Sequence, residues 1–78
     1  MSAMQAMREI PTVEYIDEGK MVAEVDVISI ETDHEWSPYF SIEDVRKLEA
    51  VRAALKRGDL KAAAALARVY ELAPVAME

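Results

Sequence analysis

The sequence predicts a small α+β domain in which a β-hairpin and a third strand near the C-terminus pack on one main helix, followed by a short second helix. Three observations support this prediction. Apolar and polar residues alternate with a period of two over residues 12–30, apolar residues recur at helical spacing after Ser41, and the glycines fall where a turn and a helix end are needed. A chain of 78 residues fits one such domain, in which a partner often completes the burial of apolar surface.

Two segments in the first half, residues 12–17 and 21–30, carry the alternating pattern. Their β-branched and aromatic residues on alternate positions predict half-buried strands. Gly19 lies between them and can adopt the positive φ of a tight turn. The two segments are therefore predicted to form a hairpin, after a flexible segment over residues 1–11.

The register of the hairpin depends on the length of its loop. A two-residue loop, Glu18-Gly19, sets Val13 against Glu24, which buries a carboxylate or exposes a valine. A three-residue loop over residues 18–20 sets Val13 against Val25 instead, so we expect the longer loop. The expected pairs on the apolar face are Val13 with Val25 and Tyr15 with Ala23.

The apolar positions change parity after Val27, to Ile28 and Ile30. This change predicts either a β-bulge or a strand end that is covered on both faces. Side chains that the predicted helices leave partly uncovered favour a homodimer. These side chains are Val22, Ile28, Ile30 and Leu72.

The main helix is predicted over residues 41–57. Ser41 is a good N-cap, and Asp44 three residues later completes a capping box. Phe40 and Val45 flank this cap at the two positions of a hydrophobic staple. The stripe expected to face the sheet consists of Val45, Leu48, Val51 and Leu55.

A corner and a second helix follow. Gly58 is predicted to end the main helix, and Asp59 to cap a helix over residues 60–67. The face of that helix is expected to carry Leu60, Ala63, Ala64 and Ala67. Residues 68–73 alternate again, which favours a third strand, although they also fit an extension of the second helix; Pro74 ends the segment in either case.

The net charge of −6 conceals an uneven distribution. Residues 9–44 hold eleven acidic residues and one basic residue, whereas residues 45–68 hold seven basic residues and two acidic ones. Two interpretations remain open: an acidic sheet and a basic helix that partly neutralise each other, or an acidic face that steers a basic partner.

The residue types argue against an enzyme. The sequence has no cysteine, and its two glycines are explained by a turn and a cap, so neither a thiol nucleophile nor a glycine-rich phosphate loop is expected. The single histidine, His34, lies among carboxylates, but a second histidine to complete a metal site is missing. No catalytic residue, cofactor or metal is therefore predicted. Without a signal peptide or a span of about 20 apolar residues, we expect a soluble cytoplasmic protein.

The residues most suited to partner binding lie where the acidic half meets the main helix. Aromatic residues are typical of interface hot spots, and carboxylates suit a basic partner. The predicted partner-binding residues are Trp36, Tyr39, Glu24, Asp26, Glu31 and Asp33. The alternative is a nucleic-acid-binding regulator whose basic helix, over residues 45–61, contacts phosphate through Arg46, Lys47, Arg57 and Lys61.

Further segments run through most of the chain, among them Glu18-Gly19-Lys20-Met21-Val22-Ala23-Glu24-Val25, Trp36-Ser37-Pro38-Tyr39, Lys47-Leu48, Val51-Arg52, Gly58-Asp59-Leu60-Lys61 and Leu66-Ala67-Arg68-Val69-Tyr70-Glu71-Leu72. In these segments the chain resembles a group of short bacterial proteins that look like antitoxin-type partners of RNase-like or RelE-type toxins. The resemblance implies a small acidic protein that covers a basic RNase surface, and it assigns no binding residue. The favoured function is thus a non-enzymatic protein-interaction module.

Overall fold

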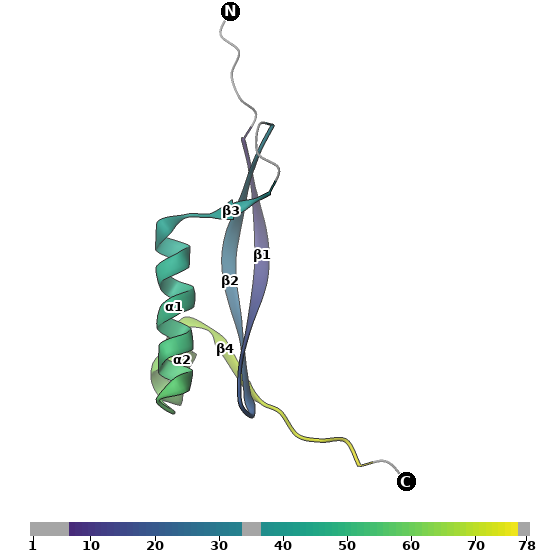
Figure 1. Cartoon of the computed structure of the whole chain (residues 1–78), viewed down its shortest axis with the longest axis vertical. Helices are drawn as coiled ribbons and strands as arrows, with labels where there is room; N and C mark the ends of the chain where they lie inside the picture. The colour runs from purple at the N-terminus through teal and green to yellow at the C-terminus, as the bar shows by residue number, and fades with distance from the viewer. Residues whose placement is uncertain (1–6, 34–36, 77–78) are drawn as a thin grey trace, which may run out of the picture.

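The computed structural model describes residues 7–33 and 37–76, which form one antiparallel sheet and two helices (Figure 1). The predicted α+β class, with a hairpin followed by two helices, is confirmed. In chain order the elements are β1 (Met7–Glu18), β2 (Met21–Thr32), β3 (Tyr39–Phe40), α1 (Ile42–Lys56), α2 (Leu60–Leu66) and β4 (Arg68–Glu71).

Strand β2 is the centre of the sheet. β1 pairs with it along its whole length, and the other edge of β2 is shared by two short strands. β3 pairs with β2 at Ser29 and Ile30, and β4 pairs with it over residues 21–24. Residues 25–28 of β2 therefore lie in a gap between β3 and β4.

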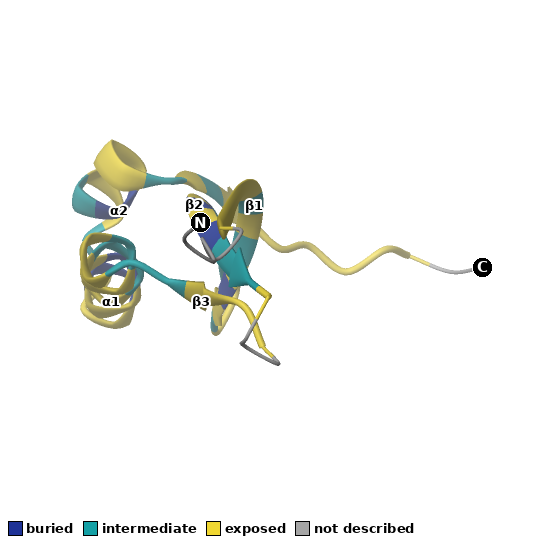
Figure 2. Cartoon of the chain, turned by 90° about the horizontal axis from the view of Figure 1, so that it is seen from above, coloured by how far each residue is buried: buried dark blue, intermediate teal, exposed yellow. Residues whose placement is uncertain are grey.

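Both helices lie on the same side of the sheet, as the view from above shows (Figure 2). We call the side of the sheet toward the helices the inner face and the opposite side the outer face. The core lies between the inner face and the helices, and the largest side chains that are fully buried in it are only valines, Val25 and Val51. The buried apolar residues are Ile16, Ala23, Val25, Val27, Val51, Ala54, Leu55 and Ala63.

The hairpin register differs from the one predicted. Glu18 pairs with Met21, so the loop is the two residues Gly19 and Lys20. Gly19 has a φ of 60° and Lys20 does not have a positive φ, as in a type II′ turn with glycine at its first central position. The register moves by one residue, which places Ile16 on the inner face opposite Ala23. Val13 and Tyr15, expected in the core opposite Val25 and Ala23, lie on the outer face.

Strand β1 is longer than predicted, because it begins at Met7 and includes part of the segment expected to be flexible. Its pairing with β2 is continuous, so the change of parity after Val27 is not a bulge. Ser29 instead continues the inner face and is buried, with 8% of its surface exposed. Ile28, which is exposed, and Ile30, which is half-buried, consequently lie on the outer face, which neither helix covers.

The start of α1 agrees with the predicted N-cap, because the Ser41 hydroxyl accepts a hydrogen bond of 3.1 Å from the Asp44 backbone N–H. The Asp44 carboxylate does not return to Ser41 as the capping box requires; it accepts a 2.8 Å bond from the backbone N–H of Ile28 in β2. Of the stripe predicted to face the sheet, Val51 and Leu55 are buried and Leu48 packs against the core, whereas Val45 is 41% exposed. Ala54, which the stripe did not include, is buried as well.

The corner between the helices is a Schellman motif. Gly58 has a φ of 74°, its N–H donates to the Leu55 carbonyl, and the Asp59 N–H donates to the Ala54 carbonyl. Asp59 then caps α2 by accepting a 3.1 Å bond from the Ala62 N–H. Both predicted signals are confirmed.

The predicted face of the second helix is confirmed in part. Ala63 is buried and Ala67 packs against the core, with Ala62 beside them, whereas Leu60 is 43% exposed and Ala64 is also exposed. After α2 the chain becomes strand β4, so the strand interpretation of this segment is confirmed over residues 68–71.

Candidate interaction surface

The outer face of the sheet carries a group of exposed apolar side chains that neither helix covers. Because side chains alternate along a strand, the register places one set of residues from all four strands on this face. The most exposed of the apolar ones are Tyr15 (64%), Met7 (59%), Leu72 (51%), Tyr70 (47%), Tyr39 (46%), Val13 (39%) and Ile28 (37%), where Leu72 directly follows β4. Large exposed apolar patches mark interaction sites in soluble proteins.

A belt of charge crosses the middle of the outer face. Arg68 of β4 donates from Nε to Glu24 Oε1 at 2.9 Å, and from Nη1 and Nη2 to the two carboxylate oxygens of Asp26 at 2.8 and 2.9 Å. The Tyr70 hydroxyl donates to the same Glu24 oxygen at 3.2 Å. This belt joins β4 to β2 and divides the apolar surface into two patches.

The hydrogen bonds from Arg68 hold the pKa of the Asp26 carboxyl below its ordinary value. The same bonds, to Asp26 first and Glu24 second, raise the pKa of the Arg68 guanidinium. All three side chains remain partly in contact with solvent, with 48% of Arg68, 26% of Glu24 and 63% of Asp26 exposed. The belt is thus a surface ion-pair network that orients β4 and contributes modestly to stability.

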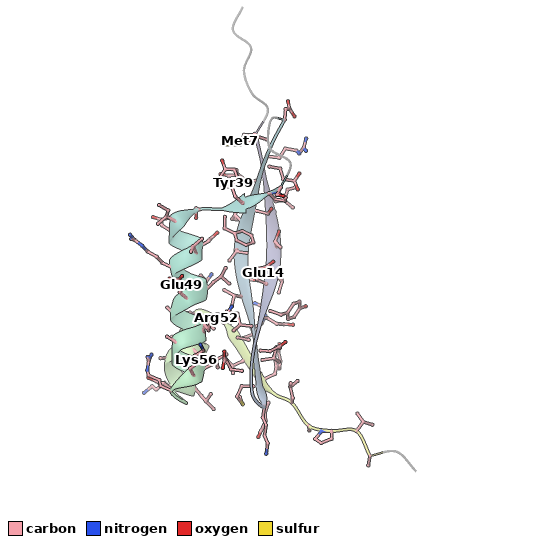
Figure 3. The ribbon with its side chains drawn as sticks, viewed as in Figure 1. Met7, Glu14, Tyr39, Glu49, Arg52 and Lys56 are labelled. Atoms are coloured by element: carbon pink, nitrogen blue, oxygen red, sulfur yellow. The ribbon has the colours of Figure 1, made fainter. Side chains whose placement is uncertain are left out.

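The first patch, beside α1 and β3, is formed by Pro11, Ile28, Ile30 and Tyr39, together with Val13. Tyr39 pairs with Ile30 at the end of the hairpin where Met7 also lies (Figure 3). The second patch, near the hairpin turn, is formed by Tyr15, Val22 and Tyr70.

Of the predicted partner-binding residues, Tyr39, Glu24 and Asp26 lie on the outer face, whereas the register places Glu31 on the inner face. Tyr39 lies in the first patch, and Glu24 and Asp26 form the belt, where they already have an intramolecular cation. Glu31 is paired with Arg8 at 3.2 Å, and Asp33 is exposed in the turn after β2. Trp36 lies outside the described residues, as does His34.

The sequence pattern missed Tyr15, Arg68 and Tyr70 as surface residues. A three-residue loop predicts Tyr15 in the core, whereas the two-residue loop of the structure places it on the outer face. Arg68 is assigned to the outer face only by the pairing of β4 with β2, in which it lies opposite Glu24.

The four basic residues of the alternative prediction lie on or directly beside the two helices. Lys47 points toward the sheet, where its Nζ donates to the Asp26 carbonyl at 2.6 Å. Arg57 Nη2 lies 3.5 Å from Asp59 Oδ2. Arg46 and Lys61 are exposed, on separate helices. Two of the four cations therefore already have partners within the chain.

Lys47 and Asp44 close the gap in the sheet. The N–H of Ile28 and the carbonyl of Asp26 face the open edge of β2, and these two side chains of α1 supply the partners that a strand would otherwise provide. A hollow of about 380 Å³ opens beside them, next to Pro11 and Val13. Each charged group that lines the hollow already makes a hydrogen bond within the chain.

No protein-family model, curated protein or solved structure matches this chain. Within the part of the chain that the structure describes, neither helix is long and apolar enough to cross a membrane.

Proposed function

We propose that this chain is a non-enzymatic protein-interaction module whose outer face binds a basic protein partner. The observation that carries the proposal is the one-sided fold, in which both helices cover the inner face and the outer face keeps five exposed aromatic or β-branched side chains in the sheet. Tyrosines are well suited to such a role, because each offers a large rigid apolar surface and a polar hydroxyl.

The charge of the outer face indicates the chemistry of the partner. The register places four carboxylates there, Glu9, Asp17, Glu24 and Asp26, and one cation, Arg68, for a net charge of −3. A second copy of the chain would bring an equally acidic face, whereas a basic surface is attracted to it. Charge complementarity therefore favours a basic protein over a second copy on this face.

The resemblance to antitoxin-type proteins gives the proposal its most specific form. In that form the partner is a small basic RNase of the RelE type, and the outer face covers the basic groups with which the RNase would contact RNA. A domain with so thin a core also gains stability from any partner that binds only its folded state.

The test is calorimetric titration of the full chain with a purified RelE-type RNase, at about 50 mM and about 300 mM salt, since screening weakens surface electrostatics. Tyr15→Ala and Tyr39→Ala remove apolar surface from the outer face and are expected to weaken binding at least about tenfold, or about 1.4 kcal/mol. Val45→Ala is the matched control, because Val45 is similarly exposed but lies on α1.

Two results would contradict the proposal. One is the absence of binding even at the lower salt concentration. The other is equal binding by the tyrosine variants and the control, which would move the interface away from the outer face. Binding that is lost only when Arg46 and Lys61 are both changed to glutamate would favour the nucleic-acid alternative, provided that it requires RNA in the sample.

A further inference from the structure

The outer edge of β1 is an unpaired strand edge. β1 gives one edge to β2 along all of its 12 residues, and no other strand among residues 7–33 and 37–76 pairs with its second edge. Such an edge presents a row of N–H and C=O groups that can pair with another extended chain. It is a feature separate from the side chains of the outer face.

The residues that face this edge follow from the pairing of β2. The Lys20 carbonyl accepts from the Leu72 N–H and the Ile28 N–H reaches α1, so even-numbered residues of β2 direct their main-chain groups away from β1. Odd-numbered residues of β2 thus bond to β1, where their partners are even-numbered. The odd-numbered residues of β1 direct their main-chain groups to the unpaired edge.

Pro11 fits this assignment. It is odd-numbered, so its nitrogen, which has no hydrogen, faces the unpaired edge, where proline is tolerated in a strand. Proline also interrupts the edge as a pairing surface. The continuous part of the edge therefore lies between Pro11 and the turn, and it consists of the main-chain groups of Val13, Tyr15 and Asp17.

The side chains along this part of β1 differ between the two faces. Val13 and Tyr15 lie on the outer face, and the half-buried carboxylates Glu14 and Glu18 lie on the inner side, with Glu14 near the middle of the strand (Figure 3). Residues 13–18 contain three carboxylates and no cation. An added strand would thus meet Val13, Tyr15 and Asp17 on the outer face, and Glu14 and Glu18 on either side of Ile16 on the inner face.

A second copy of β1 would bring to this edge another run of residues 13–18 with three carboxylates and no cation. Antiparallel pairing about a two-fold axis at Val13 would set Tyr15 beside Pro11 and would bring Glu9 opposite Asp17. Like charges directly opposite each other in a sheet are destabilising. The same carboxylates attract a strand that carries lysine or arginine, so charge selects a basic segment.

We propose that the edge of β1 over residues 12–18 accepts an extended basic segment of the partner as an additional antiparallel or parallel strand. Alternating residues of that segment would place apolar side chains beside Val13 and Tyr15, and cationic side chains beside Glu14 and Glu18. This inference rests on the proposed function in that it names how a basic partner is held: by main-chain pairing, with side chains selecting the charge.

The probe is a heptapeptide that alternates lysine and valine, titrated into the full-length ¹⁵N-labelled protein and followed by NMR. We expect the largest amide shifts, and slower hydrogen exchange, at Val13, Tyr15 and Asp17. A peptide of the same sequence that is N-methylated at alternate residues cannot form the main-chain bonds on one edge. We expect it to bind at least tenfold more weakly, and a glutamate–valine peptide to bind least.

A pair of variants tests the main-chain contact from the protein side. Val13→Pro removes an N–H that faces the unpaired edge but leaves the β1–β2 bonds in place, as Pro11 already does. Val13→Ala removes apolar side-chain surface and keeps the N–H. We expect the proline variant to lose at least tenfold in peptide affinity relative to the alanine variant.

Each outcome decides the question. Absence of peptide binding, shifts confined to Tyr39 and Tyr70, or equal affinities of the proline and alanine variants would overturn the strand-addition inference. If Val13→Pro fails to fold, the comparison of methylated and unmethylated peptides on the wild-type protein decides alone. Peptide binding at β1 without any binding of a basic RNase would retain strand addition and reject the proposed partner, so the two failures are distinguishable.

Discussion

The two faces of the central strand show how one hairpin serves two purposes. On the inner face of β2, Ala23, Val25 and Val27 are at most 2% exposed, because α1 and α2 pack on them. On the outer face, Ile28 is 37% exposed although it is as apolar as the valines beside it. Val27 and Ile28 are consecutive residues of β2, and they point to opposite faces of the sheet. Apolar content alone therefore does not assign a side chain to the core.

The inner face provides the stability of the fold, but it does so with small side chains. Its largest fully buried residues are valines, and α2 contributes the alanine Ala63. Burial of apolar surface contributes roughly 25 cal/mol per Å², so small side chains give a modest total. The apolar residues that would enlarge the core instead lie on the outer face, where they are available to a partner.

The largest effect that separates the two faces is expected from neighbouring residues of β1. Ile16→Ala removes the only buried apolar side chain of that strand and should lower the free energy of unfolding by about 3 kcal/mol. Tyr15→Ala, on the outer face, should change it by less than about 1 kcal/mol. Urea unfolding followed by circular dichroism measures both values.

This pair also tests the register. If the hairpin had the three-residue loop, Tyr15 would be in the core and Ile16 at the surface, and the two costs would be exchanged. Equal losses in the free energy of unfolding for Ile16→Ala and Tyr15→Ala would indicate that the two faces are less distinct than their exposure implies.

Much of the fold could be predicted from the sequence because its signals are local. The cap at Ser41, the end at Gly58 and the cap at Asp59 each depend on a few adjacent residues, and all three are found in the structure. The hairpin was also predicted, since its strands alternate around a glycine. What failed was the register, because Gly19 fits the first position of a two-residue turn as well as the middle of a longer loop.

The surface was harder to predict for a related reason. The partner of the Asp44 carboxylate is a strand residue 16 positions away, and the partner of Asp26 is 42 positions away. Local patterns assign Asp44 to the helix cap and leave Asp26 as a carboxylate available to a partner. Only the pairing of β3 and β4 with the same edge of β2 shows why the carboxylates of Asp44 and Asp26 both have hydrogen-bond partners within the chain.

A second, smaller effect is expected at the gap in that edge. Asp44→Ala leaves the Ile28 N–H without its acceptor, and it removes an acidic residue from the first turn of α1. We expect a loss of about 1–2 kcal/mol in the free energy of unfolding. Asp44→Asn keeps an acceptor oxygen and should retain about half of that stability. Amide hydrogen exchange provides a local measurement. In Asp44→Ala, exchange should accelerate more at the Ile28 amide than at the Val25 amide.

Unchanged exchange at Ile28 in Asp44→Ala would mean that the helix does not close this edge of β2. The distinction between the faces would then need revision, because the gap would be a second open edge beside that of β1.

The smallest expected effect concerns the charged belt of the outer face and its dependence on pH. The pKa of Asp26 is lowered in the folded state by its hydrogen bonds to Arg68, so the folded protein binds this proton less readily than the unfolded chain does. The stabilisation is therefore complete above the unfolded-state pKa of about 3.9 and is lost as the pH falls through the lower, folded-state value.

Asp26→Asn lacks this contribution at every pH. The wild type should exceed the variant in urea midpoint at pH 7, and the two should converge below about pH 4. A constant difference between them across this range would show that the belt aligns β4 by geometry alone, without a net electrostatic contribution from Asp26. Because the pair is exposed, added salt should also reduce the difference at pH 7, which places the belt among the features that orient the outer face and leaves the stability of the fold to the inner one.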